Sequence, residues 1–206
     1  MKKTITGIAV LGIVAVGCAA MVSEEEKEAK ALAVMKASFK ANGQATLDRL
    51  DQDPMQKMCS RYHGDNKMPK EVADKLEKDQ QALIKYPADG KLLGDWKEGE
   101  KIAQSGQGKQ FSDDPSVPAG ANCYACHQLS KAELSFGTIG PPLYNFAKVR
   151  GFTPEMQKYA YSKVYNSQAF SACSNMPRFG HAGILTENQI QDVVALLMDP
   201  DSPINK

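Results

Sequence analysis

Hydrophobic residues recur at helical spacing in several stretches of this chain, and none of these stretches alternates strictly as a half-buried strand does. In the last stretch Ile190, Val193, Val194 and Leu197 form an apolar stripe that begins after Thr186, a residue suited to capping a helix. The predicted helices cover residues 23–42, 69–86, 95–104, 153–166 and 186–198, with two short helical turns between 44 and 64. The chain is therefore predicted to be all-α.

The starts of several of these helices carry local signals. Ser23 with Glu26, and Asp95 with Glu98, have the spacing of a capping box, in which two side chains satisfy two free backbone N–H groups. Pro69 is expected at the first helical position, where the missing N–H costs nothing. These signals place the helix starts without reference to the rest of the fold.

The first twenty residues have a different pattern. Lys2 and Lys3 precede an apolar run that is shorter than the roughly 20 residues needed to span a bilayer. We predict a secretion signal over residues 1–20, and hence a periplasmic protein. Cys18 in "AVGC" offers an alternative, a lipoprotein cleavage site with a lipid-anchored cysteine, although Ala15 stands where such sites usually carry leucine.

The rest of the chain is divided by composition. Residues 21–88 are predicted to form a helical N-terminal extension, and residues 89–206 a second domain in which a Gly/Pro/Ser-rich loop leads to a cysteine motif. The formal net charge of the 206-residue chain is +1. Because a nucleic-acid-binding domain usually carries a marked basic excess, no nucleic-acid partner is expected.

The segment "NCYACHQLS", residues 122–130, carries the candidate chemistry. Cys123 and Cys126 are separated by two residues, and His127 follows directly. A structural zinc site needs four ligands, and a thioredoxin-like pair is expected among strands, so both alternatives fit poorly. C-x-x-C-H is the pattern of c-type haem attachment, with two thiols bonded to the porphyrin and the histidine on the iron. One covalent haem c is therefore expected.

The segment "GTIGPPLYNF", residues 137–146, resembles the Gly-Pro-x-Leu signature of the class I cytochromes c. In that family the proline carbonyl accepts the N–H of the haem-binding histidine, a role that the resemblance gives to Pro141. The helices predicted at 95–104 and 186–198 resemble the two helices that cross in that family, with Gly99 allowing a close approach. The resemblance covers residues 89–206 and implies a class I cytochrome c fold.

A second axial iron ligand is expected in the irregular stretch ahead of the last helix. Met176 lies there in "NMPRFG", as in class I cytochromes, whereas most other methionines occupy helix positions where packing is the default role. His181 in the same loop is the alternative ligand, and His63 is expected on the surface. A haem with both axial sites filled by protein is suited to electron transfer rather than substrate binding.

A narrower resemblance is to the SoxX family, the small c-type cytochrome subunits of the SoxAX complex of sulfur-oxidising bacteria. It is carried by "GDWKEGEKIAQSGQG", "GANCYACHQL" and "ACSNMPRFGHAGILTENQIQDVVALLMDPDSPIN". The resemblance implies a heterodimer with a SoxA-type cytochrome that carries the catalytic haem. Thiosulfate would be joined oxidatively to a cysteine of the carrier SoxYZ. This chain would pass the released electrons to a downstream acceptor, as a thiosulfotransferase subunit without a catalytic residue of its own.

Two other functions remain open at this point. A free-standing periplasmic shuttle to a terminal oxidase would use the same haem site but would not need the helical extension. A haem sensor would have Met176 displaced by a small gas. A plain structural role for the extension, as a brace over the domain, is a further alternative.

Cys59 and Cys173 remain after these assignments, in a compartment where thiols oxidise. A disulfide between them would tie the extension to the loop that carries Met176. It would close a loop of roughly 115 residues, for which the chain-entropy estimate is on the order of 4–5 kcal/mol. The alternative is a pair of buried free thiols.

Overall fold

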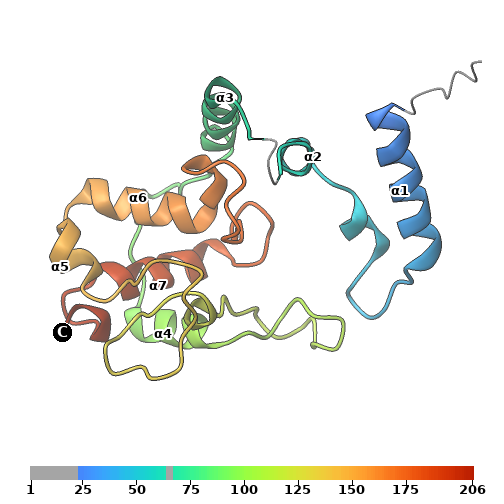
Figure 1. The fold of residues 1–206 in the computed structure, drawn as a ribbon. Helices are drawn as coiled ribbons and strands as arrows, with labels where there is room; N and C mark the ends of the chain where they lie inside the picture. Colours follow the sequence, from blue (N-terminus) through green and yellow to red (C-terminus); the bar gives the residue numbers. More distant parts are fainter. Residues whose placement is uncertain (1–22, 64–66) are drawn as a thin grey trace, which may run out of the picture. The chain divides into compact units, whose positions relative to one another are not determined.

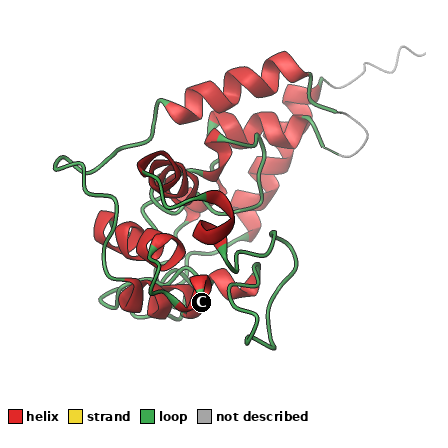
Figure 2. Cartoon of the chain, turned by 90° about the vertical axis from the view of Figure 1, so that its left-hand side faces the viewer, coloured by secondary structure: helices red, strands yellow, loops and turns green. Residues whose placement is uncertain are grey.

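The computed structural model in Figure 1 describes residues 23–63 and 67–206. These residues contain seven α-helices and four short 3₁₀ helices, and their only β-pairing is a single bridge between Asn42 and Ala45 (Figure 2). The prediction of an all-α fold is confirmed. The α-helices are α1 (Glu24–Ser38), α2 (Pro54–Arg61), α3 (Lys70–Gln81), α4 (Trp96–Gln104), α5 (Phe146–Arg150), α6 (Pro154–Tyr165) and α7 (Glu187–Met198).

The predicted secretion signal at residues 1–20, with Cys18, lies outside the described residues. Within the described ranges, no helix has both the length and the apolar content needed to cross a membrane.

Backbone contacts divide the chain into two compact units, one ending at Phe39 and the other running from Lys40 to Lys206. Sequence composition placed a boundary after residue 88 instead. The difference arises because α2 and α3 pack with the C-terminal half of the chain, as their hydrogen bonds to residues beyond 160 show. Residues 40–88 therefore belong to the same compact unit as residues 89–206.

The first unit contains α1, in which no residue is buried. The predicted capping box is present: the Ser23 hydroxyl accepts from the Glu26 N–H, and the Glu26 carboxylate accepts from the Ser23 N–H. The helix ends at Ser38, before the predicted stop at Asn42-Gly43, because Phe39 is already extended. Without packing on its apolar residues, little favours a longer helix here.

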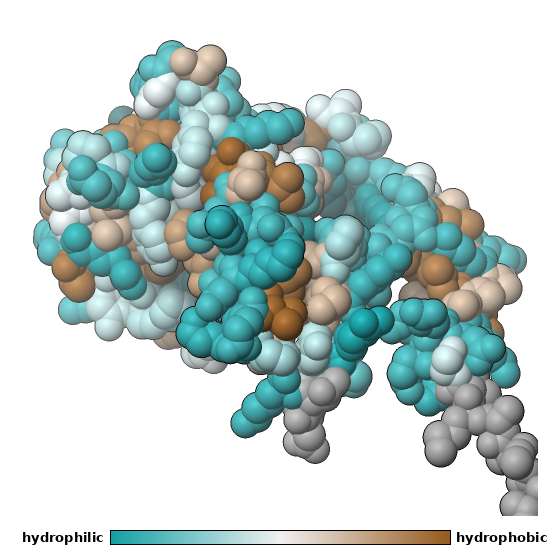
Figure 3. Space-filling view, turned by 90° about the horizontal axis from the view of Figure 1, so that it is seen from above, coloured by the Kyte–Doolittle hydropathy of each residue, from teal (hydrophilic) through white to brown (hydrophobic). Residues whose placement is uncertain are grey.

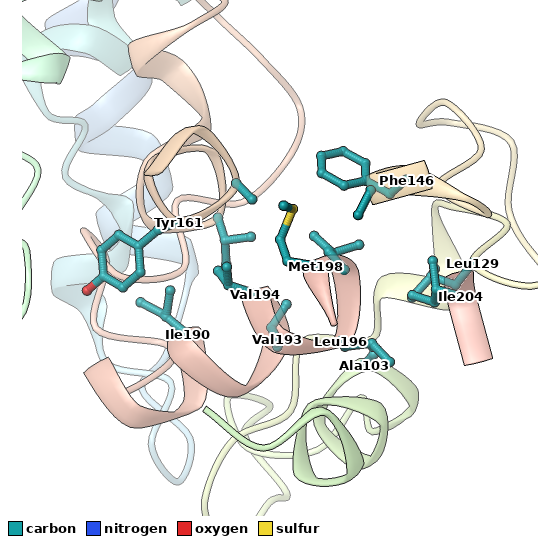
Figure 4. Packing of buried hydrophobic residues seen from close by; sticks show 14 of the residues in the cluster. Ala103, Leu129, Phe146, Tyr161, Ile190, Val193, Val194, Leu196, Met198 and Ile204 are labelled. Carbon is teal, nitrogen blue, oxygen red and sulfur yellow. The ribbon is translucent and has the colours of Figure 1, made fainter. Parts of the chain in front are cut away.

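The core of the second unit is built where α4 and α7 cross. A Cβ atom on Gly99 of α4 would collide with the carbonyl oxygen of Asp192 on α7, so glycine permits this close approach, as expected. Figure 4 shows the apolar side chains of α7, among them Val194 and Leu196, packed between Tyr161 of α6 and Ala103 of α4. The apolar stripe of the last helix is thus buried against two other helices.

The start of α4 differs from the prediction. The Asp95 carboxylate accepts from the N–H of Lys97, but the N–H of Asp95 donates to the carboxylate of Asp192 at 2.8 Å. Glu98 forms an ion pair with Lys101 instead of reaching back to the cap. The predicted capping box of Asp95 and Glu98 is therefore wrong, because a residue of α7 takes the backbone N–H that Glu98 would have accepted.

The helix predicted at 69–86 is shorter in the structure. Pro69 precedes α3 as its cap rather than occupying the first helical position, and α3 ends at Gln81. After Gln81 the chain leaves the helix and makes hydrogen bonds to α6. The carbonyl of Lys85 accepts from the Tyr161 hydroxyl at 3.3 Å, and the Tyr86 hydroxyl lies 2.8 Å from the Ser162 hydroxyl.

The other predicted elements have their expected places. Thr153 caps α6 by accepting from the Met156 N–H, and Thr186 forms a complete capping box with Gln189 at the start of α7. The two helical turns expected between 44 and 64 are a 3₁₀ helix at Leu47–Leu50 and α2. The surface seen from above in Figure 3 is largely hydrophilic, with hydrophobic residues in small separate groups.

Candidate functional site

A mostly apolar cavity of about 450 Å³ lies in the second unit, within the range of about 300–1,000 Å³ typical of cofactor sites. It is walled by the cysteine motif, the segment after it, α5, α6, the loop before α7, and α7 itself. Every residue that the sequence assigned to haem binding lines this one cavity. These residues are Cys123, Cys126, His127, Pro141 and Met176.

The cysteine motif folds into a tight turn that presents its reactive groups together. Cys123 begins a 3₁₀ helix, preceded by Asn122 in a left-handed conformation with φ of 45°. The backbone N–H groups of Cys126 and His127 both donate to the carbonyl of Cys123, at 3.1 and 2.9 Å. This turn directs two thiols and an imidazole to the same cavity from only five consecutive residues.

The ring of His127 is oriented through its Nδ1 atom, which lies 2.7 Å from the carbonyl oxygen of Pro141. A carbonyl oxygen can only accept, so Nδ1 must carry the proton. The Nε2 atom then keeps its lone pair and is available to a metal, the arrangement usual for metal-binding histidines.

The segment before Pro141 is fitted closely to the imidazole. The N–H of Gly140 donates to the carbonyl of Cys126 at 2.8 Å, which brings this backbone against the cysteine motif. A Cβ atom at position 140 would collide with the His127 ring. Glycine is therefore required here by close approach, and this requirement fits a histidine held in one orientation.

The two thiols of the motif are not bonded to each other. Burial raises the pKa of the Cys123 thiol to about 12, so this group is protonated at neutral pH. Among the described residues, no three His, Cys, Asp or Glu side chains come together as a metal cluster. The site therefore fits thioether bonding to a porphyrin better than zinc binding.

The loop before α7 brings Met176 to the cavity. Its carbonyl accepts from the Ser167 hydroxyl at 2.5 Å, and its N–H donates to the Ser174 hydroxyl at 3.3 Å. The described residues that line the cavity include Met176 but not His181. His63 is exposed, as expected. Of the three candidate ligands, only the methionine shares the cavity with His127.

The alternative ligand His181 has a different environment. Burial and the nearby Arg178 guanidinium lower the pKa of the His181 imidazole, while the Asp53 carboxylate opposes them. Its backbone N–H donates to the carbonyl of Tyr165 at 3.0 Å. His181 is thus bonded to the end of α6 through its backbone and is not among the residues that line the cavity.

Two basic residues that sequence reasoning missed also line the cavity, Arg150 at the end of α5 and Lys163 on α6. Burial lowers the pKa of the Lys163 amine, which donates to the carbonyl of Ser167 at 3.2 Å. A porphyrin carries two propionate carboxylates, with which such cations can pair. Helical spacing could have found Lys163, because it lies one turn beyond Tyr159 and Ala160, which also line the cavity.

Cys59 of α2 and Cys173 of the methionine loop are joined by a disulfide, with their Cα atoms 5.4 Å apart. The two residues are separated by 114 positions in the sequence. The bond therefore attaches the part of the chain that precedes the cysteine motif to the loop that carries Met176.

Comparison with known proteins agrees with this geometry. A family model described as cytochrome c matches residues 106–199, a range that holds every predicted haem residue. A protein of Aquifex aeolicus (strain VF5), described as an uncharacterized lipoprotein, is 39% identical over 156 residues. The match covers 75% of this chain and 73% of that protein. The all-α class I cytochrome c fold is confirmed, and a cytochrome c domain implies the binding of haem c. This chain therefore contains a cytochrome c domain.

Proposed function

We propose that this protein is a monohaem electron-transfer cytochrome in which Cys123 and Cys126 bond the haem, and His127 and Met176 ligate its iron. The observation that carries the proposal is that these four side chains line one cavity while Pro141 orients the histidine. When bound, a haem c supplies a one-electron iron couple.

The role of the protein residues follows from their placement. His127 offers Nε2 because Pro141 holds the proton on Nδ1, and Met176 offers a thioether from the loop before α7. Filling both axial positions with protein groups leaves no open iron site for a substrate, which favours electron transfer over catalysis at this centre. Arg150 and Lys163 line the cavity and would be the cations available to the propionates of a bound haem, and the apolar walls would keep water from its iron.

The specific pathway that we propose is that of the SoxX family. Its support is the resemblance of three segments, two of which contain the cysteine motif and the Met176 loop. On this proposal the chain forms a heterodimer with a SoxA-type cytochrome, which holds the catalytic haem and joins thiosulfate to a cysteine of SoxYZ. The chain contributes to that thiosulfotransferase by passing electrons to a downstream acceptor.

The N-terminal extension does not by itself argue for this partner. Residues 40–88 are accounted for by internal packing, since α2 and α3 bond to the loop between α6 and α7. The brace interpretation is therefore favoured for this part of the chain. A free-standing shuttle would use the same haem site. The presence or absence of a stable SoxA-type partner therefore distinguishes the two functions.

We propose a periplasmic location, reached through the signal at residues 1–20. The relative from Aquifex aeolicus is described as a lipoprotein, which supports lipid anchoring at Cys18 as the form that this export takes. Metabolic labelling with a fatty acid, in wild type and in Cys18→Ser, tests the anchor. We expect wild type to carry the label and Cys18→Ser to lack it. If wild type is unlabelled, the protein is exported without a lipid anchor.

Haem attachment is tested by expressing wild type and the Cys123→Ala, Cys126→Ala variant with a c-type maturation system. We expect peroxidase-active stain at the protein's mass on a denaturing gel for wild type alone. A haem that acidic acetone extracts from wild type would contradict covalent attachment.

The proposed complex is tested by affinity purification from the native organism grown on thiosulfate. A SoxA-type cytochrome should co-purify in a stable one-to-one complex. Recovery of a monomer at micromolar concentration in the presence of that organism's SoxA-type protein would instead favour the free-standing shuttle.

A further inference from the structure

The methionine loop is attached to α2 on both sides of Met176. Before it, Cys173 is bonded to Cys59 in the last turn of α2. After it, a guanidinium nitrogen of Arg178 lies 2.6 Å from a carboxylate oxygen of Asp53, the residue that caps α2. One short helix therefore holds the loop three residues before the methionine and two residues after it.

The ion pair of Arg178 and Asp53 is well placed to fix this geometry. Only 11% of the Arg178 side chain is exposed, and 33% of the Asp53 side chain. The second carboxylate oxygen of Asp53 accepts from the N–H of Gln56 at 2.8 Å, which locks the carboxylate at the start of α2. Loss of the carboxylate would leave a largely buried guanidinium without its ion-pair partner, a costly state.

The earlier part of the same loop is held by α3. Three polar side chains on α3 bond to the chain between the end of α6 and Cys173. The contacts are Glu77 with the N–H of Ala172 at 2.8 Å, Gln80 with the amide of Asn166 at 3.0 Å, and Gln81 with the carbonyl of Ala169 at 2.8 Å. Figure 1 shows α3 beside the end of α6, where this segment begins.

The loop has little regular structure with which to hold itself. From the 3₁₀ helix that ends at Ala169 to the start of α7 at Glu187, the described chain contains no helix or strand. Cys173 has a φ of 60°, a left-handed conformation that is unfavourable for a residue other than glycine. Such a conformation persists where the surroundings determine it, and here the disulfide lies at that residue.

We propose that α2 and α3 are a clamp whose task is to position Met176 as an iron ligand. Asp53, Cys59, Cys173 and Arg178 are its positioning residues, and residues 40–88 thereby regulate how readily the iron exchanges its methionine for another ligand. The inference rests on the proposed function, since it concerns the same methionine, and it adds a role for the extension.

Ligand exchange gives a readout that a merely structural role would not change. An added ligand such as imidazole reaches the iron only when the methionine loop opens, so its apparent affinity reports the open fraction. We would titrate imidazole into the ferric holoprotein, well below its unfolding temperature, and follow the weak red absorption of methionine-ligated ferric haem c. The variants are Asp53→Asn and the double variant Cys59→Ala, Cys173→Ala.

The clamp predicts that each variant binds imidazole roughly tenfold more tightly than wild type, a change of about 1.4 kcal/mol in the opening equilibrium. Asp74→Asn is the matched control. Asp74 is an exposed residue of α3 in an ion pair with Lys70, whereas the α3 side chains that bond to the loop in the described structure are Glu77, Gln80 and Gln81. Its affinity for imidazole should stay within about twofold of wild type. Asp53→Glu keeps the negative charge on a longer side chain. Its affinity for imidazole should lie between those of wild type and Asp53→Asn.

The outcomes separate the clamp from the proposed haem ligation. Wild type without a methionine signature would overturn the assignment of Met176, and the clamp with it. Wild type with the signature, but with both variants unchanged in imidazole affinity and lowered only in thermal stability, would overturn the clamp alone. If the double variant does not fold, phosphine reduction of the wild-type disulfide, verified by counting free thiols, makes the same comparison and should be reversed by reoxidation.

Discussion

The Nδ1 atom of His127 and the carbonyl oxygen of Pro141 are 2.7 Å apart, although 14 positions separate these residues in the sequence. This contact sets the tautomer of the imidazole and leaves the lone pair of Nε2 available to a metal. Gly140 makes the contact possible, because its backbone passes against the ring without a side chain. The orientation of the proposed iron ligand thus depends on two neighbours, one that accepts a hydrogen bond and one that leaves room.

Gly140→Ala should therefore impair the site. The added Cβ atom would overlap the His127 ring, and relieving that overlap must move the ring or the backbone, at a cost of roughly 1–3 kcal/mol. We expect a lower free energy of unfolding in guanidinium chloride and less haem incorporated per chain. Gly106→Ala is the control, since its nearest neighbour is the Asn122 side chain at 3.1 Å, which can move. Equal loss in both variants would contradict this explanation.

Replacing the two loop candidates separately tests the axial ligand. Met176→Ala should abolish the red absorption of the ferric protein, because the cavity then offers no thioether at that position. His181→Ala should leave that absorption in place, since His181 does not share the cavity with His127 in the described structure. The opposite pattern in the two visible spectra would assign the ligand to His181.

Removing the disulfide should destabilise the whole second unit. The bond closes a loop across 114 positions, and loss of such a bond typically costs about 2–4 kcal/mol. We expect the Cys59→Ala, Cys173→Ala variant to unfold at lower urea concentration, with a steeper dependence on urea because its unfolded chain exposes more surface. In wild type, mass spectrometry of a non-reduced digest should recover the two cysteine peptides joined, and alkylation of both without prior reduction would contradict the bond.

The ion pair of Asp53 predicts a dependence of stability on acid. Burial would raise the pKa of the Asp53 carboxyl, but the N–H of Gln56, the Arg178 guanidinium and His181 outweigh burial, so its pKa lies below the ordinary value. The carboxylate therefore stabilises the fold fully above about pH 4, near the unfolded pKa, and this contribution is lost as the pH falls through the lower folded pKa.

Asp53→Asn isolates this contribution. At neutral pH the variant should be less stable by about 1–2 kcal/mol, below the about 3–5 kcal/mol of fully buried pairs because Asp53 is partly exposed. The difference between wild type and variant should shrink as unfolding is measured from pH 6 down to pH 3. A difference that stays constant over that range would contradict the assignment of this stabilisation to the charge, since asparagine caps a helix about as well as aspartate.

Much of the fold and of the haem motif could be read from local sequence. Thr186 with Gln189 starts α7 as predicted, because a capping box involves backbone and side-chain groups only three residues apart. The turn at Cys123 likewise places its thiols and His127 together through hydrogen bonds within five residues. The identity of Pro141 as the partner of His127 came from resemblance to a family, and its geometry is present in the structure.

Tertiary structure decided what lay beyond the reach of local signals. Glu98 has the spacing of a capping box with Asp95. The N–H of Asp95 instead donates to the carboxylate of Asp192, because α4 and α7 cross there. The position of Met176 in the cavity, with His181 outside it, could not follow from two residues in one irregular loop. Arg178 finds Asp53 only because α2 folds back across 125 positions of sequence. Sequence by itself specifies hydrogen bonds that close within a turn, whereas contacts between distant segments depend on how the apolar core brings those segments together.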